Sequence, residues 1–222
     1  MRHVFVSLGL VAVLSFTQLA SPVAADARSD CSDADSAQTR IEGCRIVLQE
    51  ENLSPQDRAT AFYNLGNAHA ALNDLEPALE AFDEAIRING TIRDYFYNRG
   101  DMLARLGNTA AALADLHEAA LIDPKDPRSV NNLGFLYAKN GDLERAFRMF
   151  TRSIALDPDY PNPHHNRGKL LRAVGNLEAA MTDLDRAITL NPQNASYLME
   201  RGMVFGRLGD PTNAIADFAA AI

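Results

Sequence analysis

Tryptophan is absent from this sequence of 222 residues, and it contains only two cysteines and five histidines. The two cysteines are too few and wrongly spaced for a structural zinc site. His117-Glu118 has no second histidine four residues later, so the zinc-protease pattern is missing. No serine or cysteine nucleophile has an evident base partner, and no glycine-rich phosphate loop is found. We therefore expect no metal site, no cofactor and no enzymatic activity.

The sequence also lacks long apolar runs, except at its N-terminus. Val4 to Ala20 is mostly apolar, and the small residues Ser21 to Ala25 follow it. This order predicts a signal peptide at residues 1–25 that is cleaved after Ala25. An uncleaved membrane anchor is the alternative, but the apolar run is short for a membrane span. We expect a periplasmic or secreted protein with no stable membrane insertion after cleavage.

Both cysteines follow the predicted cleavage site. An exported protein can form disulfides, which favours a Cys31–Cys44 bond over two unpaired thiols with Cys44 in the core. Such a bond would stabilise the fold by about 3 kcal/mol. Ala37, Ile41, Cys44 and Leu48 share one helical face. We therefore interpret residues 26–58 as an N-terminal tail and a capping helix, with Ser54-Pro55 opening the next helix.

Glycine recurs every 34 residues, and we attribute every glycine in the chain to the repeat that this period marks. Alanine and large apolar residues keep the same register, which lets paired helices interlock. A period of 34 is typical of stacked helix-turn-helix units, so we predict an all-α solenoid. The periodic glycines are Gly66, Gly100, Gly134, Gly168 and Gly202. The predicted repeats are 59–92, 93–126, 127–160, 161–194 and an incomplete 195–222.

A second set of residues divides each repeat into two helices. Asn73 and the glycines at 107, 141, 175 and 209 can end the first helix in the left-handed conformation. An aspartate or asparagine follows each of them and is expected to cap the second helix. Pro124, Pro158 and Pro192 should stop second helices. Arginines that precede the periodic glycine are expected to lie against the neighbouring repeat; these are Arg99, Arg167 and Arg201.

These positions resemble the tetratricopeptide repeat family. The matching pattern is an apolar or aromatic residue, then L-G or R-G, then A…F…A…P, and it covers residues 59–222. The family's frequent tryptophan is missing. The resemblance implies antiparallel helix pairs that stack into a right-handed superhelix, with the first helix of each pair on the concave face. It also implies a non-catalytic scaffold that binds other proteins.

The charge is divided between the two helices of the repeats. The whole chain has a net charge of −8. The first helices carry ten basic and three acidic residues, a net of +7, whereas the remainders of the repeats carry six basic and eighteen acidic residues, a net of −12. If the first helices line the concave face, a basic groove lies inside an acidic shell. The acidic balance of an exported protein argues against nucleic acid as a ligand, so we expect none.

Family geometry selects a set of residues expected to face the groove. Aromatic, methionine and basic side chains together suit a protein or peptide partner with acidic and apolar groups. Ordinary solvated helix surface is the alternative interpretation. The predicted groove residues are Tyr63, Asn67, Tyr97, Asp101, Arg105, Arg128, Asn131, Phe135, Lys139, His165, Lys169, Arg172, Met199, Met203 and Arg207.

Some members of the family bind a partner's C-terminal carboxylate with two lysines, an arginine and two asparagines. Here Asn67 and Asn98 match, and Arg128 occupies one lysine position. Tyr63 and Asn132 replace the other lysine and the arginine. A complete carboxylate clamp is therefore not expected.

The fifth repeat stops within its second helix, and no polar capping helix follows in this sequence. An uncovered apolar face can mark an interface, so homodimerisation through this end is one hypothesis and a longer repeat array is another. The residues expected to be partly uncovered are Ala214, Phe218, Ala221 and Ile222. Two alternative functions follow: an assembly subunit that acts through this end, or an accessory module of a longer enzyme.

Overall fold

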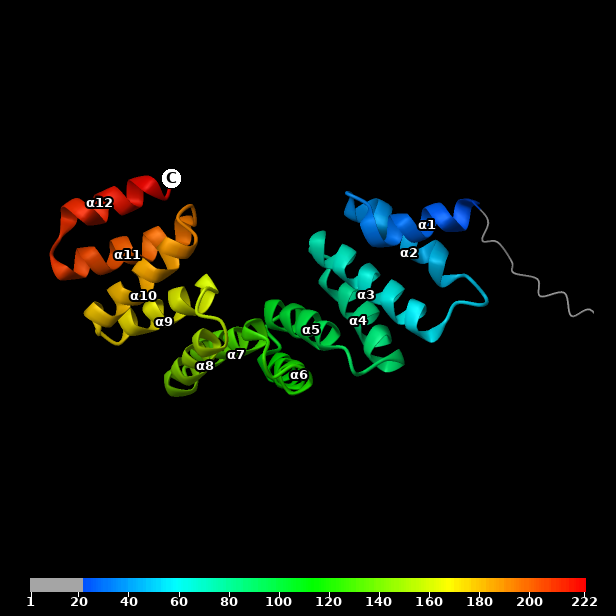
Figure 1. Cartoon of the computed structure of the whole chain (residues 1–222), viewed down its shortest axis with the longest axis horizontal. Coiled ribbons are helices and arrows are strands. Elements are labelled where there is room, and N and C mark those ends of the chain that lie inside the picture. The colour runs from blue at the N-terminus through cyan, green and yellow to red at the C-terminus, as the bar shows by residue number, and fades with distance from the viewer. Residues whose placement is uncertain (1–21) are drawn as a thin grey trace, which may run out of the picture.

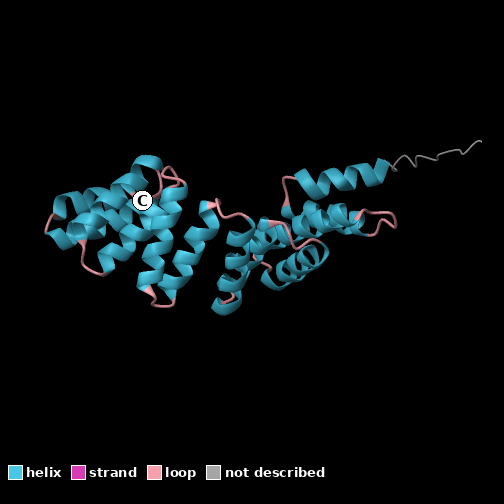
Figure 2. Ribbon diagram, turned by 60° about the horizontal axis from the view of Figure 1, so that its bottom comes forward, coloured by secondary structure: helices cyan, strands magenta, loops and turns pink. Residues whose placement is uncertain are grey.

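A computed structural model describes residues 22–222, so most of the predicted signal peptide lies outside the described residues. In that range the chain forms twelve α-helices and no strands (Figures 1 and 2). None of these helices combines the length and apolar character needed to cross a membrane. The helices are α1 (Pro22–Asp33), α2 (Ala37–Leu48), α3 (Pro55–Ala71), α4 (Leu75–Ile88), α5 (Arg93–Arg105), α6 (Thr109–Ile122), α7 (Pro127–Lys139), α8 (Leu143–Leu156), α9 (Pro161–Ala173), α10 (Leu177–Leu190), α11 (Ala195–Leu208) and α12 (Pro211–Ala220).

Consecutive helices pack as antiparallel pairs, and the pairs stack side by side as a solenoid. Figure 1 shows that the stack curves into an arch, with α1 and α12 at its two ends. At the bend, α5 and α7 face the inside of the arch, while α6 and α8 lie outside. The predicted all-α solenoid is therefore confirmed. The first helices of the repeats are placed where they can line a common concave surface.

The periodic glycines bring the two helices of a pair into close contact. A Cβ atom on Gly66 would lie 2.6 Å from the Phe82 ring, and one on Gly134 would lie 2.7 Å from the Phe150 ring. Both phenylalanines are almost completely buried. A side chain at the glycine would displace the ring that fills the core, so the small and large residues must alternate in register.

The predicted turns between paired helices form in every repeat. Asn73 and the four glycines at the equivalent positions all have positive φ, from 64° at Asn73 to 87° at Gly175. The next residue caps the second helix through its side chain in four repeats. Asp74 differs, because its carboxylate lies 3.4 Å from Nδ1 of the buried His69 and makes no cap hydrogen bond. The second helices end at Ile122, Leu156 and Leu190, two residues before the predicted prolines.

Arginines before the periodic glycine join neighbouring repeats, as predicted. Arg99 donates two hydrogen bonds of 2.7 Å to Asp115 of its own repeat and one of 2.6 Å to Asp83 of the preceding repeat. Arg201 makes the same contacts with Asp217 and Asp185, and Arg167 bonds to Asp183 and Thr151. Each arginine therefore holds three helices from two repeats together.

The segment before the repeats contains a helix that the sequence interpretation missed. Residues 26–33 were predicted as a tail, but they belong to α1, which packs against α2. Cys31 and Cys44 form the predicted disulfide, with their Cα atoms 4.5 Å apart. Gly43 lies outside the 34-residue period, so assigning every glycine to the repeat was wrong. A Cβ atom there would lie 2.7 Å from the Cys31 nitrogen, so glycine allows the two backbones to approach.

The apolar face of α12 is more buried than expected. Ala214 is buried, which corrects the prediction that it is partly uncovered; it occupies the small-residue position that faces the paired helix. Phe218 remains 39% exposed, although its equivalents in the first four repeats are buried. The helix of each of those equivalents packs against the first helix of the following repeat.

Candidate functional site

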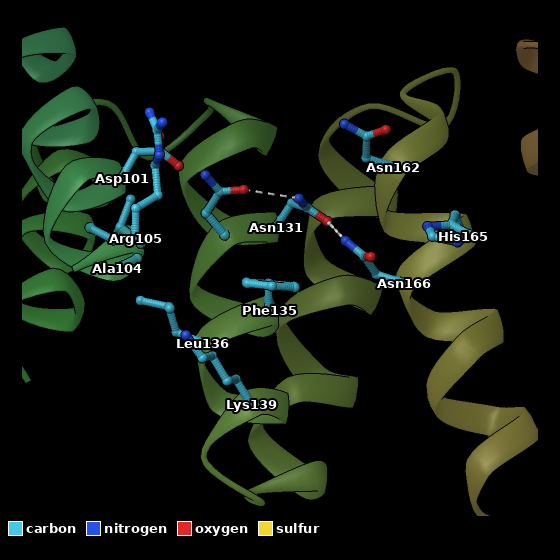
Figure 3. Close-up of a pocket in the computed structure, with 12 residues that line it drawn as sticks. Asp101, Ala104, Arg105, Asn131, Phe135, Leu136, Lys139, Asn162, His165 and Asn166 are labelled. Atoms are coloured by element: carbon cyan, nitrogen blue, oxygen red, sulfur yellow. Dashed lines mark hydrogen bonds between the residues drawn. The ribbon is translucent and has the colours of Figure 1, made fainter. Parts of the chain in front are cut away.

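The inner side of the arch contains a cavity of about 480 Å³ at the junction of α5, α7 and α9 (Figure 3). Figure 3 shows side chains from these three helices around a common space. The cavity is lined by Asp101, Ala104, Arg105, Leu116, Asn131, Asn132, Phe135, Leu136, Lys139, Asn162, His165 and Asn166. The lining combines the apolar side chains of Ala104, Leu116, Phe135 and Leu136 with amides and charged groups, and this combination suits a ligand with both kinds of group.

Six of the predicted groove residues line this cavity together: Asp101, Arg105, Asn131, Phe135, Lys139 and His165. Phe135 is 49% exposed, which is unusual for an aromatic side chain at the centre of a concave surface. Asn131 is buried at the wall. The other predicted residues do not line this cavity; Tyr63 and Asn67 lie on α3, and Met199, Met203 and Arg207 lie on α11.

Asparagines two positions before the periodic glycine connect the first helices. Asn98 donates to Asn67 at 2.7 Å and to the Tyr63 hydroxyl at 3.2 Å. Asn132 donates to the Tyr97 hydroxyl at 3.1 Å, and Asn166 donates to Asn131 at 2.9 Å. These three asparagines, here called the amide series, repeat every 34 residues along the groove. The recurrence of these asparagines is visible in the sequence. The sequence analysis nevertheless did not select Asn162 and Asn166 as groove residues, and it did not place Asn132 in the cavity.

Sequence comparison identifies the repeats. Profiles described as "Tetratricopeptide repeat" match residues 59–91 and 127–160, and a profile described as "TPR repeat" matches residues 100–141 and 168–209. The chain belongs to the tetratricopeptide repeat (TPR) family. Comparison with curated proteins gives no match.

Several solved TPR structures share the fold. PilF of Pseudomonas aeruginosa is 19% identical, with a TM-score of 0.71 over 87% of this chain and 90% of that one. MamA of Desulfovibrio magneticus is 20% identical, with a TM-score of 0.64 over 76% and 95%. YrrB, described as a TPR protein with an unusual peptide-binding site, is 18% identical, with a TM-score of 0.59 over 82% and 92%. At these identities the similarity concerns the fold alone.

Several basic residues of the TPR groove are neutralised by neighbouring acids. Arg172 bonds to the buried Glu200 at 2.9 Å, and Lys169 lies 3.9 Å from the same carboxylate. Arg128 bonds to Asp126 at 2.9 Å and its guanidinium lies 5.6 Å from the Tyr97 ring centroid. The helix-by-helix charge count therefore overestimates the free positive charge of this surface.

Three predicted basic residues keep their charge available. Within residues 22–222, no carboxylate lies within 4 Å of the basic nitrogens of Arg105, Lys139 and Arg207. Arg105 instead bonds to the Asn73 side chain, and Arg207 bonds to the Arg172 carbonyl. Arg105 and Lys139 both line the cavity, so the available positive charge is concentrated there.

Burial shifts the pKa of two cavity residues. Burial raises the pKa of Asp101, and the charge of Arg105 opposes this change. Burial also lowers the pKa of His165, which favours its neutral imidazole. The His165 ring packs against the Tyr197 ring, with the ring centroids 4.7 Å apart. Among the described residues, no group of three His, Cys, Asp or Glu side chains converges to hold a metal ion.

The carboxylate clamp of other family members does not form here. Asn67 and Asn98 bond to each other, and Arg128 is paired with Asp126. Tyr63 accepts a hydrogen bond from Asn98 instead of presenting a positive charge.

Acid should destabilise the array through two buried aspartates. Burial acts to raise the pKa of Asp126 and Asp183, but hydrogen bonds from Ser129 and Arg128 to Asp126, and from Arg167 to Asp183, leave the pKa of both below the ordinary value of 3.8. The stabilisation from these carboxylates is complete above that value and is lost as pH falls through the folded pKa values.

Urea unfolding between pH 7 and pH 2.5 should show this loss of stability, with a shallower pH dependence in Asp126→Asn. The exposed Asp35→Asn is the control; equal pH dependence in the two variants would contradict this assignment.

Proposed function

We propose that this protein is an exported, non-catalytic scaffold that binds a segment of a partner protein in the inner groove. The cavity between α5, α7 and α9 carries the proposal. It combines an exposed aromatic side chain, two available cations and a row of amides on one concave surface. Tetratricopeptide proteins are generally scaffolds, and YrrB is described as having a peptide-binding site. The disulfide and the predicted signal peptide support export.

The amides give this surface a way to bind a backbone. An extended segment exposes one donor and one acceptor per residue, and side-chain amides can supply both. Asn132 donates one hydrogen bond to Tyr97 and accepts one from Asn131, whereas Asn166 donates one to Asn131; both amides line the cavity and keep a second N–H donor for a ligand. Arg105 and Lys139 would then select segments with acidic side chains.

Charge reversal in the cavity tests this function. The double variant Arg105→Glu/Lys139→Glu should bind the partner at least about tenfold more weakly, because like charges replace complementary ones. The remaining binding should also depend less on salt. Arg172 is left intact, because its bond to Glu200 makes it a packing residue. The partner is obtained by affinity capture from cell-envelope extract, and its binding is then measured by calorimetry.

The matched control is Arg148→Glu/Arg152→Glu on the outer helix α8, which changes the net charge equally. Both arginines are exposed. Equal affinity of the two double variants would contradict the groove proposal. Affinity lost only in the control would instead place the partner on the outer surface.

A second candidate function is assembly through α12. Ile215 and Phe218 on this helix are 67% and 39% exposed. Grouped apolar side chains of this kind can form an interface. If α12 is the working surface, Ile215→Ser/Phe218→Ser will abolish partner capture or self-association, and the cavity variant will not. Light scattering at high protein concentration measures self-association directly.

A further inference from the structure

A second cavity of about 440 Å³ adjoins the first, between α7, α8 and α9. Phe135, Lys139 and Asn166 line both cavities, so the two are neighbours along the groove. Figure 3 shows Phe135 projecting from α7 between the α5 side chains and Asn166. The second cavity is lined by Phe135, Ala138, Lys139, Leu143, Phe150, Asn166, Lys169, Leu170 and Ala173.

The two cavities are copies of one another, displaced by one repeat. Eight of the nine residues of the second cavity lie 34 positions after a residue of the first. Only Leu143 has no such equivalent among the lining residues. The repeat therefore places the same kind of depression at successive junctions, and the side chains decide what each one can hold.

The copies differ in polarity. Asp101 and Leu116 of the first cavity correspond to Phe135 and Phe150 of the second, and Lys139 corresponds to Ala173. Phe135 of the first cavity corresponds to Lys169, which adds a charge, but the lining of the second cavity remains mostly apolar. Phe135 and Leu143 are 49% and 40% exposed, so a bulky apolar side chain placed there would remove apolar surface from water.

Of the two available cations, Arg105 lines the first cavity alone and Lys139 lines both. No carboxylate of the described residues lies within 4 Å of the basic nitrogens of either. Lys139 and Lys169 also line the second cavity, but Lys169 shares the carboxylate of Glu200. Asp101 also lines the first cavity and offsets part of this charge, but Arg105 and Lys139 leave a net positive charge there that can attract an acidic group, whereas the mostly apolar lining of the second cavity favours an apolar group.

The repeat also sets the distance between the two sites. Packed helices lie about 8–10 Å apart, and neighbouring first helices such as α7 and α9 are in contact. An extended chain advances about 3.3 Å per residue. Side chains that enter neighbouring cavities should therefore come from positions about three residues apart.

We propose that the groove recognises an extended segment with an acidic side chain and a bulky apolar side chain, about three residues apart. The acidic side chain occupies the cavity between α5 and α7, near Arg105 and Lys139. The apolar side chain, such as leucine, methionine or phenylalanine, occupies the cavity between Phe135 and Leu170. This inference rests on the proposed function and adds a sequence preference to it.

Synthetic peptides test this preference with the whole mature chain. Fluorescein-labelled, C-terminally amidated decapeptides of serine and glutamine carry one glutamate and one leucine, separated by one to six positions in either order. Fluorescence polarisation should show the highest affinity at a separation of about three in one of the two orders. Replacing leucine with serine in the best peptide should weaken binding about tenfold or more, since the apolar burial is lost.

Ala173→Lys tests the second cavity directly. Ala173 is exposed at the end of α9, and the substitution copies Lys139 from the preceding repeat, so the fold should tolerate it. It should weaken binding of the glutamate–leucine peptide about tenfold and leave the glutamate–serine peptide unchanged or tighter. Ala155→Lys, in the last turn of the outer helix α8, is the matched control and should change neither.

The outcomes separate this preference from the proposed function. If peptides bind and Arg105→Glu/Lys139→Glu abolishes binding, but the separation and Ala173→Lys have no effect, the sequence preference is wrong and the groove function stands. If peptide affinity is unaffected by both cavity variants, or if no peptide binds, the preference is overturned as well. In that case, a captured partner that remains sensitive to Arg105→Glu/Lys139→Glu would still support the groove.

Discussion

Replacing Arg99 with leucine should lower the free energy of unfolding by about 3 kcal/mol. Arg99 supplies both hydrogen bonds that satisfy the Asp115 carboxylate, which is only 6% exposed. Removing the arginine leaves a buried charge without a partner, which typically costs 3–5 kcal/mol. We expect the lower end of this range, because the Arg99 side chain keeps 23% of its exposure and water can reach the site.

The chain itself suggests the compensating change. Repeat 3 has leucine at the arginine position, Leu133, and methionine at the aspartate position, Met149. Repeat 1 likewise combines Leu65 with Ala81. Arginine and aspartate therefore occur together or not at all in these five repeats. The double variant Arg99→Leu/Asp115→Met copies repeat 3 and should recover most of the lost stability, since a packed apolar pair can replace a buried ion pair.

A double-mutant cycle measures this coupling by urea unfolding of the wild type, the two single variants and the double variant. Asp83 accepts a third bond from Arg99 but is 61% exposed, so Asp83→Ala should cost well under 1 kcal/mol. Additive effects of Arg99→Leu and Asp115→Met would show that the pair does not act as a unit. A double variant less stable than Arg99→Leu would show that the apolar pair cannot fill this site.

The regular part of the fold could be predicted because each element repeats five times. The period placed the close contact at Gly66 and its equivalents, and the positive φ at Asn73 and the following turn glycines. A local signal that is weak in one copy becomes decisive when it recurs in register. The contacts of Arg99 with two repeats were predictable for the same reason.

Features without a repeat were harder to predict. Helix α1 has few buried side chains, and Gly43 makes a single close approach that no period reveals. The charge of the groove was misjudged for another reason. Glu200 was counted with its own helix, but its carboxylate also neutralises Arg172 on the neighbouring one. Side-chain geometry decides which charges remain available, and a count of charges by helix does not include that geometry.

Reducing the Cys31–Cys44 disulfide should release α1 from the rest of the solenoid. Among the described side chains of α1, only Ala27 and Cys31 are buried, and the ion pair between Arg28 and Glu50 is partly exposed. Surface ion pairs of this kind contribute at most about 1 kcal/mol. The disulfide closes a loop with a sequence separation of 13, which stabilises by about 3 kcal/mol. It is therefore the main connection of this helix.

Hydrogen exchange of the oxidised and reduced wild type measures this effect and keeps both cysteine side chains in place. Amide protection should fall by about 100-fold in α1 and partly in α2, as expected for a loss of about 3 kcal/mol. Protection from α5 onward should not change, because each repeat contacts only its neighbours. Cys31→Ala/Cys44→Ala should reproduce the reduced protein, and Val47→Ala, which removes packing but no crosslink, should not release α1. Unchanged protection of α1 after reduction would show that α1 is held by packing, and the protein would then need no oxidising compartment to keep its N-terminal cap.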